Sequence, residues 1–141
     1  MQRIPGYLAL AFVLAACQPQ DLVVANPEFR PPLGTGAIGA GYFSIRSPED
    51  DRIVAVSSQA AARVEMHAST TTGQVTRMER ADGVDLPAGQ TVKFEPGGLH
   101  LMVFSPEVKG DATFPITFEF RSGRRMTVGF GVVTAAPEPH D

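Results

Sequence analysis

The sequence predicts an all-β domain, an antiparallel β-sandwich, from three observations. Apolar residues recur in short runs of four to eight residues, and several runs alternate with polar residues as half-buried strands do. No run of ten or more residues carries the 3.6-residue apolar period of a helix. Turn-forming residues separate the runs, as at Ser47-Pro48, Pro96-Gly97-Gly98 and Ser122-Gly123.

The first four expected strands are bounded by two turn signals. In chain order they are residues 39–45, 51–56, 62–68 and 74–80. Ser47-Pro48 separates the first two strands, and a loop centred on Thr72 and Gly73 joins the second two as a hairpin.

The last four expected strands follow turns that contain glycine. They are residues 91–94, 99–104, 114–120 and 126–133. Pro87-Ala88-Gly89 precedes the first of them, Pro96-Gly97-Gly98 precedes the second, and Ser122-Gly123 joins the last two.

Residues 1–16 have the pattern of a signal peptide. Their apolar run is well short of the roughly 20 residues that span a bilayer. The end of this segment and the residue after it, Leu14-Ala15-Ala16-Cys17, resemble the lipobox of bacterial lipoproteins, in which the cysteine is lipid-modified and becomes the new N-terminus. Leu14 is larger than the residue that an ordinary A-x-A-like cleavage site has there. We therefore expect a lipid anchor at Cys17, on the periplasmic side of a bacterial cell envelope.

The mature chain is expected to have three parts. Residues 17–37 are rich in Pro and Gly and are expected to form a lipid-anchored tether with a possible first strand at 22–25. Residues 38–134 form the sandwich domain, and residues 135–141 form a flexible tail. Gln18 stands where lipoproteins retained at the inner membrane of Gram-negative bacteria often have Asp, which favours the outer membrane.

Composition excludes several functions. Cys17 is the sole cysteine, so the domain has no disulfide, catalytic thiol or thiolate ligand. A blue-copper electron carrier and a thiol-disulfide reductase both need a cysteine. The formal net charge is −3, or −4 once Arg3 is removed, and there is no Lys/Arg-rich run to bind nucleic acid.

His67, Met78, His100 and Met102 form the pattern H-x10-M-x21-H-x-M. Two imidazoles and two thioethers suit soft Cu(I), whereas Mg and Ca prefer oxygen and structural Zn prefers Cys, His or carboxylate. Any one of these residues alone would more simply fill the core or form a hydrogen bond. Beyond the signal peptide, however, the chain has only three His and four Met, and two of each fall on this pattern. The pattern therefore predicts a copper site.

This spacing resembles that of the periplasmic copper chaperones named PCuAC. Residues 39–45 look like the early small-residue and Tyr strand of that family, Glu95–Met102 is similar to its most recognisable motif, and 115–133 match its closing strand pair. Residues 26–30 depart from it, since the family has a Trp-containing segment there. The resemblance implies a cupredoxin-like sandwich and a Cu(I) site at the four residues of the pattern.

Strand geometry gives an expected arrangement of the ligands. His100 and Met102 are two residues apart, so their side chains share one face of a strand. If the hairpin pairs residues whose numbers sum to 145, His67 lies directly opposite Met78, with Cβ atoms about 4.5 to 5.5 Å apart. Thr72 suits a two-residue type I′ turn poorly, which favours a four-residue loop.

Other His, Met and Ser residues fit simpler interpretations. Met66 alternates with His67 and is expected in the core, and Met126 is an ordinary strand side chain. His140 lies in the Pro-rich tail and is expected to be solvated. Ser69 lies near His67 but lacks a G-x-S-x-G elbow and an accompanying acid, which argues against hydrolysis.

The resemblance implies a monomeric copper chaperone, not an enzyme, that delivers Cu(I) to respiratory copper centres such as that of cytochrome c oxidase. Its partners would be a copper-accepting oxidase subunit or another copper chaperone, and the membrane through Cys17. Two alternatives remain open: a lipoprotein for copper sequestration or resistance, and a metal-free module that binds another envelope protein. Copper binding distinguishes the last alternative from the other two, and copper transfer distinguishes delivery from sequestration.

Overall fold

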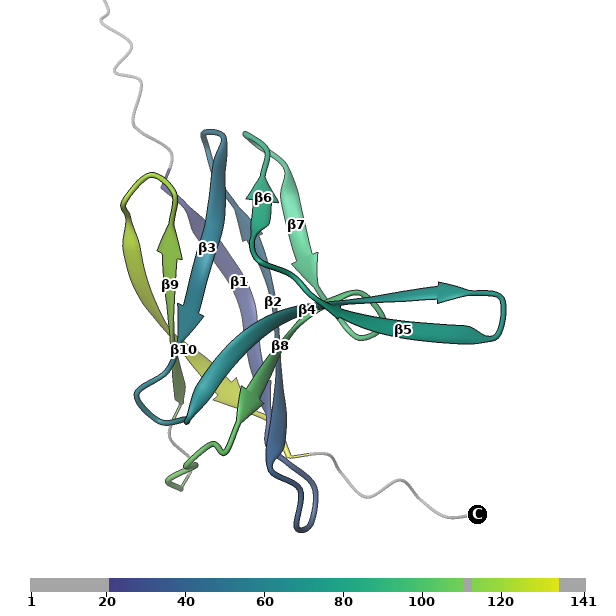
Figure 1. Ribbon diagram of the computed structural model, residues 1–141. Coiled ribbons are helices and arrows are strands. Elements are labelled where there is room, and N and C mark those ends of the chain that lie inside the picture. Colours follow the sequence, from purple (N-terminus) through teal and green to yellow (C-terminus); the bar gives the residue numbers. More distant parts are fainter. Residues whose placement is uncertain (1–20, 111–112, 135–141) are drawn as a thin grey trace, which may run out of the picture.

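The computed structural model describes residues 21–110 and 113–134 (Figure 1). This part of the chain contains ten β-strands and no helix, so it also contains no helix that could cross a membrane. The strands are β1 (Val23–Arg30), β2 (Ile38–Arg46), β3 (Asp51–Ser57), β4 (Arg63–Thr72), β5 (Val75–Arg80), β6 (Val84–Leu86), β7 (Thr91–Phe94), β8 (Leu99–Phe104), β9 (Phe114–Phe120) and β10 (Arg125–Val132).

The strands pair in the order β5-β4-β8-β7-β2-β1-β10-β9-β3-β6, and the sheet curls into a sandwich. The predicted all-β sandwich is confirmed. Two parallel pairings, β1 with β10 and β7 with β8, interrupt the otherwise antiparallel order that the sequence predicts. The β4–β5 hairpin projects from the body of the sandwich, and all six residues of β5 are exposed (Figure 1).

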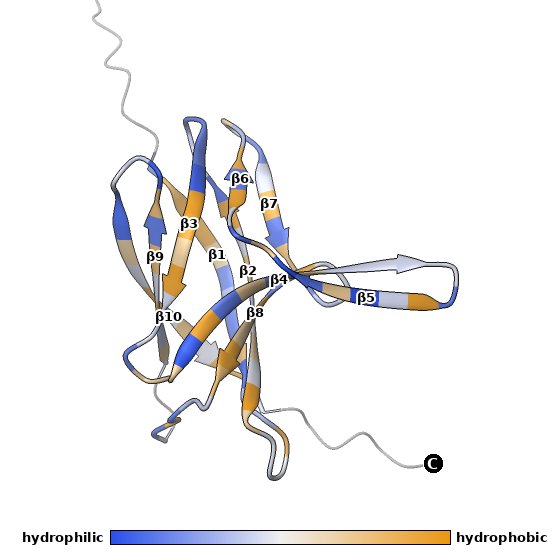
Figure 2. Cartoon of the chain, in the orientation of Figure 1, coloured by the Kyte–Doolittle hydropathy of each residue, from blue (hydrophilic) through white to orange (hydrophobic). Residues whose placement is uncertain are grey.

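The core is built from the inward-facing residues of alternating strands. In Figure 2 hydrophobic and hydrophilic residues alternate along β4, whose Val64 and Met66 are buried, so the prediction that Met66 is a core residue is confirmed. Phe43 stacks on Phe94 at 4.3 Å between ring centroids and meets the edge of Phe130 at 5.6 Å. Such pairs add about 0.5 to 1.5 kcal/mol beyond the burial of their area.

Strand β1 is longer than the sequence predicts. The chain continues as a strand through Asn26 and Pro27, where the register with β2 shifts and Asn26 takes a φ of +50°. Phe29, beyond this bulge, is 0% exposed and stacks on Phe114 at 4.2 Å. Residues 23–30 are therefore part of the sandwich, although the sequence assigned most of them to a tether.

The remaining strands lie close to their expected positions, with one addition. Strand β6 has only three residues and was missed, since it is too short for alternation to identify. The predicted signal peptide, the lipid anchor at Cys17, and the tail with His140 lie outside the described residues.

Asp51 ties the start of β3 to the β9–β10 turn. Its carboxylate accepts hydrogen bonds from the Arg52 amide at 2.8 Å, the Ser122 hydroxyl at 2.7 Å and the Ser122 amide at 3.1 Å. Partial burial raises the pKa of Asp51, but these hydrogen bonds lower it by more, so the pKa lies below its ordinary value. A depressed folded-state pKa stabilises the fold above the unfolded-state pKa of about 3.9, and this contribution is lost as the pH falls through the folded-state pKa.

We expect Asp51→Asn to lower the free energy of unfolding by about 1 kcal/mol at pH 7 and to have a smaller effect at pH 2. Urea unfolding at the two pH values measures this difference. Asp82→Asn, at an exposed position between β5 and β6, is the matched control and should leave the free energy of unfolding at pH 7 unchanged. Identical pH dependence in Asp51→Asn and the wild type would contradict the assignment.

Candidate metal centre

Strands β4 and β8 bring three of the four predicted ligands to one face. In their antiparallel register His67 lies directly opposite His100, and Glu65 lies directly opposite Met102. The two imidazole centroids are 5.9 Å apart, with their planes inclined by 26°. The intervening residues Met66 and Leu101 point into the core, so the site lies on the outer face of the sheet.

His100 is buried although it lies on this outer face, with 7% of its surface exposed. Its Nδ1 atom lies 2.9 Å from the carbonyl oxygen of Gly98, which can only accept, so Nδ1 is the donor and, in the neutral imidazole, the lone pair lies on Nε2. The Nε2 atom is buried and has no hydrogen-bond partner among the described residues. Buried polar atoms nearly always have a partner, and a metal ion bound at Nε2 would be the partner that this atom lacks.

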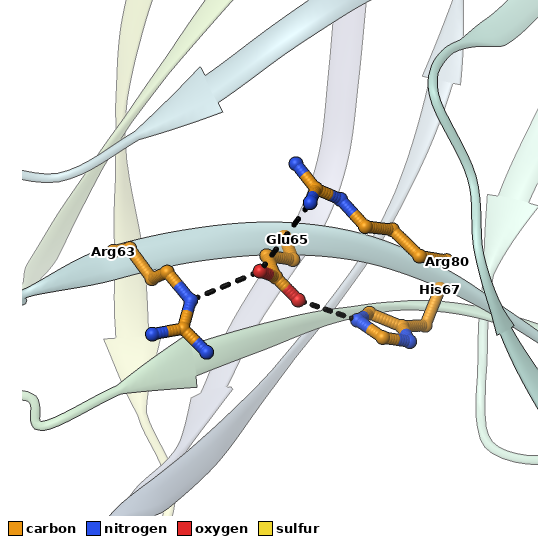
Figure 3. A network of polar contacts seen from close by, with 4 residues as sticks. All are labelled: Arg63, Glu65, His67 and Arg80. Atoms are coloured by element: carbon orange, nitrogen blue, oxygen red, sulfur yellow. Dashed lines mark hydrogen bonds and ion pairs between the residues drawn. The ribbon is translucent and has the colours of Figure 1, made fainter.

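His67 is held by a carboxylate. Its Nε2 atom lies 2.9 Å from Oε2 of Glu65, and the other oxygen of Glu65 accepts a hydrogen bond from Nε of Arg63 at 2.9 Å (Figure 3). The hydrogen bond from His67 lowers the pKa of Glu65 most, and the hydrogen bond from Arg63 lowers it further, so this pKa lies below its ordinary value. Glu65 is thus ionised at neutral pH, and no sequence pattern marks it as a site residue.

Met78 does not lie opposite His67, so the predicted hairpin register was wrong. Met78 is paired with Ser69, and His67 is paired with Arg80. The turn is the two-residue Gly73-Gln74 rather than a four-residue loop, with Gly73 at a φ of +63° that glycine adopts readily.

The register differs from the prediction by two residues, which keeps Met78 on the same face as His67. The two residues are diagonal neighbours, about 7 to 8 Å apart. Met78 is 61% exposed, whereas Met102 is half-buried beside the histidines. The structure therefore brings His67, His100 and Met102 together and places Met78 one step farther along the projecting hairpin.

The side chains at this face include a thioether as well as two imidazoles. No group of three or more His, Cys, Asp or Glu side chains suited to a metal occurs within residues 21–110 and 113–134. Two imidazoles and a thioether form a donor set that suits a soft metal ion, and the unpartnered Nε2 of His100 fits such a cargo.

Comparison with known proteins gives the family. The family described as "Putative lipoprotein LpqE-like" matches residues 22–132. The chain belongs to the LpqE-like family.

Two curated relatives resemble this LpqE-like chain. It is 30% identical over 83 residues to "Putative lipoprotein Lxx21020" of Leifsonia xyli subsp. xyli, a match covering 57% of this chain and 50% of that protein. It is 28% identical over 139 residues to "Uncharacterized protein RP573" of Rickettsia prowazekii, covering 88% of this chain and 77% of that protein. The chain thus spans about half the length of the first relative.

Solved structures share the fold of this LpqE-like chain. The copper-bound PCuAC domain from PmoF2 is 21% identical, with a TM-score of 0.66 over 84% of this chain and 97% of that domain. Apo-DR1885 from Deinococcus radiodurans is 21% identical, with a TM-score of 0.54 over 96% of this chain and 97% of that protein. The expected resemblance to PCuAC proteins and the cupredoxin-like β fold are confirmed.

Proposed function

We propose that this LpqE-like chain binds Cu(I) through His67, His100 and Met102 and passes the ion to a partner. The buried, unpartnered Nε2 atom of His100 is the observation that carries the proposal. A soft cation at this face would satisfy that lone pair and would find a second imidazole and a thioether beside it. The shared fold with a copper-bound PCuAC domain supports the same conclusion.

Met78 completes the proposed ligand set as its exposed member. Its side chain lies on the face of His67 but outside the buried cluster, where a partner reaches it before the histidines. A thioether binds Cu(I) without adding charge, so one sulfur ligand can be exchanged for another at little electrostatic cost. Transfer then begins by replacement of Met78 with a ligand of the partner.

The proposed setting is the periplasmic side of the cell envelope, with the chain lipid-anchored at Cys17 in the outer membrane. Membership of a family described as lipoproteins supports the anchor. The proposed recipient is a respiratory copper centre such as that of cytochrome c oxidase, or another copper chaperone. Transfer of Cu(I) from the loaded protein to an apo copper-centre domain tests delivery, because a sequestering protein retains the metal.

We expect Met102→Leu to weaken Cu(I) binding by about tenfold or more, ~1.4 kcal/mol, with the fold preserved because Leu and Met have similar volumes. Competition with a chromophoric Cu(I) chelator measures the affinity. Met126→Leu, on β10, is the matched control and should bind Cu(I) like the wild type. A Met78→Leu, Met102→Leu double variant that binds Cu(I) as tightly as the wild type would refute the proposed site.

A further inference from the structure

Glu65 is a polar side chain at this face that the proposed ligand set leaves out. It lies on β4, two residues before His67 and directly opposite Met102, and 14% of its side chain is exposed. A carboxylate so enclosed is costly unless it is paired. Its contacts therefore indicate what it does there.

Three side chains hold the Glu65 carboxylate (Figure 3). Oε2 accepts from Nε2 of His67 at 2.9 Å, and Oε1 accepts from Nε of Arg63 at 2.9 Å. Nη1 of Arg80, the residue opposite His67 on β5, lies 3.9 Å from Oε1. Arg63 is itself positioned by the ring of Phe104, with 3.8 Å between its guanidinium carbon and the ring centroid. The carboxylate is thus held by two residues of its own strand and, at longer range, by one residue of β5.

Glu65 is poorly suited to bind Cu(I) itself. Its oxygens are hard donors, which Cu(I) disfavours, and both already accept hydrogen bonds. The carboxylate instead accepts a hydrogen bond from one nitrogen of His67, Nε2. An imidazole whose Nε2–H donates to a carboxylate keeps its lone pair on Nδ1.

We propose that Glu65 is a positioning residue that fixes His67 in the tautomer with Nδ1 free, so that His67 offers Nδ1 and His100 offers Nε2 to the same copper ion. The inference rests on the proposed function and adds which nitrogen each histidine uses. For His100 the acceptor is the carbonyl oxygen of Gly98, which binds Nδ1 and so fixes the tautomer with Nε2 free. A carboxylate behind a ligating histidine also makes that imidazole a stronger donor. Arg63 and Arg80 keep the carboxylate in place.

The test compares Glu65→Ala, which removes the acceptor, with Glu65→Gln, which keeps the shape and an acceptor oxygen but loses the charge. Long-range ¹H–¹⁵N correlation spectra of the copper-free protein report which nitrogen of His67 is protonated. We expect Nε2–H in the wild type, a mixture of tautomers in Glu65→Ala and a smaller change in Glu65→Gln. Cu(I) affinity should fall about 10- to 100-fold in Glu65→Ala. The matched control is Glu79→Gln, an exposed glutamate on β5.

The outcomes are distinct. An unchanged His67 tautomer in folded Glu65→Ala would overturn the inference, and so would an altered tautomer with wild-type Cu(I) affinity. Wild-type protein that binds no Cu(I), or a His67→Ala variant that binds it normally, would instead overturn the proposed function. Thermal unfolding of each variant confirms that it is folded before these comparisons are made.

Discussion

Replacing His100 with alanine is expected to abolish high-affinity Cu(I) binding, the largest effect of any single substitution at the site. His100 is the most deeply buried donor, and its Nε2 atom is fixed with a free lone pair. Loss of a group that only hydrogen-bonds to a metal ligand typically lowers metal affinity about 10- to 100-fold. Loss of the ligand itself should therefore lower Cu(I) affinity more than about 100-fold. Competition with a chromophoric Cu(I) chelator measures the change.

The control for this prediction separates ligand loss from loss of packing. His100→Asn places an amide where it can still donate to the Gly98 carbonyl, but it offers no imidazole nitrogen in the position of Nε2. Both variants should unfold cooperatively and bind Cu(I) weakly. High-affinity Cu(I) binding by His100→Asn would show that His100 is structural rather than a ligand.

A chain that begins at residue 38 is expected not to fold. Strand β1 lies between β2 and β10, so its removal leaves one edge of each neighbour unpaired and exposes the site where Phe29 packs. Phe29→Ala is the graded form of this change, with an expected loss of about 3 to 5 kcal/mol. Small domains have only about 5 to 15 kcal/mol of stability in total. Urea unfolding followed by circular dichroism measures both variants.

Two controls accompany the truncation. A chain that begins at Asp21 keeps β1 and should unfold cooperatively. Leu33→Ala removes an apolar side chain that is 79% exposed in the β1–β2 connection, and it should change stability by no more than about 0.5 kcal/mol. Wild-type stability in the chain that begins at residue 38 would mean that β1 is a tether after all.

Most of the sandwich could be predicted from local sequence patterns. Alternation and turn residues are local signals, and they located β2 to β5 and β7 to β10 within a few residues. The extension of β1 could not be found in this way, because Asn26-Pro27 is a turn signal and only pairing with β2 and β10 keeps the chain extended beyond it. Strand β6 is too short to show a period.

The candidate site shows the same limit. Alternation determines which face a side chain occupies, so His100 and Met102 were correctly placed on one face of β8. Register is set by where the turn is centred, and the sequence predicted a loop centred on Thr72 and Gly73. The turn is centred on Gly73 and Gln74, one residue later, which shifts the pairing by two residues. Glu65 shares the face of His67 by the same alternation, but its hydrogen bond to that ring depends on rotamers that sequence patterns do not determine.

The projecting hairpin has an evolutionary consequence. Strand β5 contributes no buried side chain to the sandwich, so mutations along it escape the purifying selection that packing imposes on the core. The histidines, in contrast, lie on β4 and β8, where neighbouring positions fill the core and substitutions are constrained. Substitutions on the exposed surface around Met78 therefore cost the sandwich little stability, whereas substitutions next to the histidines disturb its core.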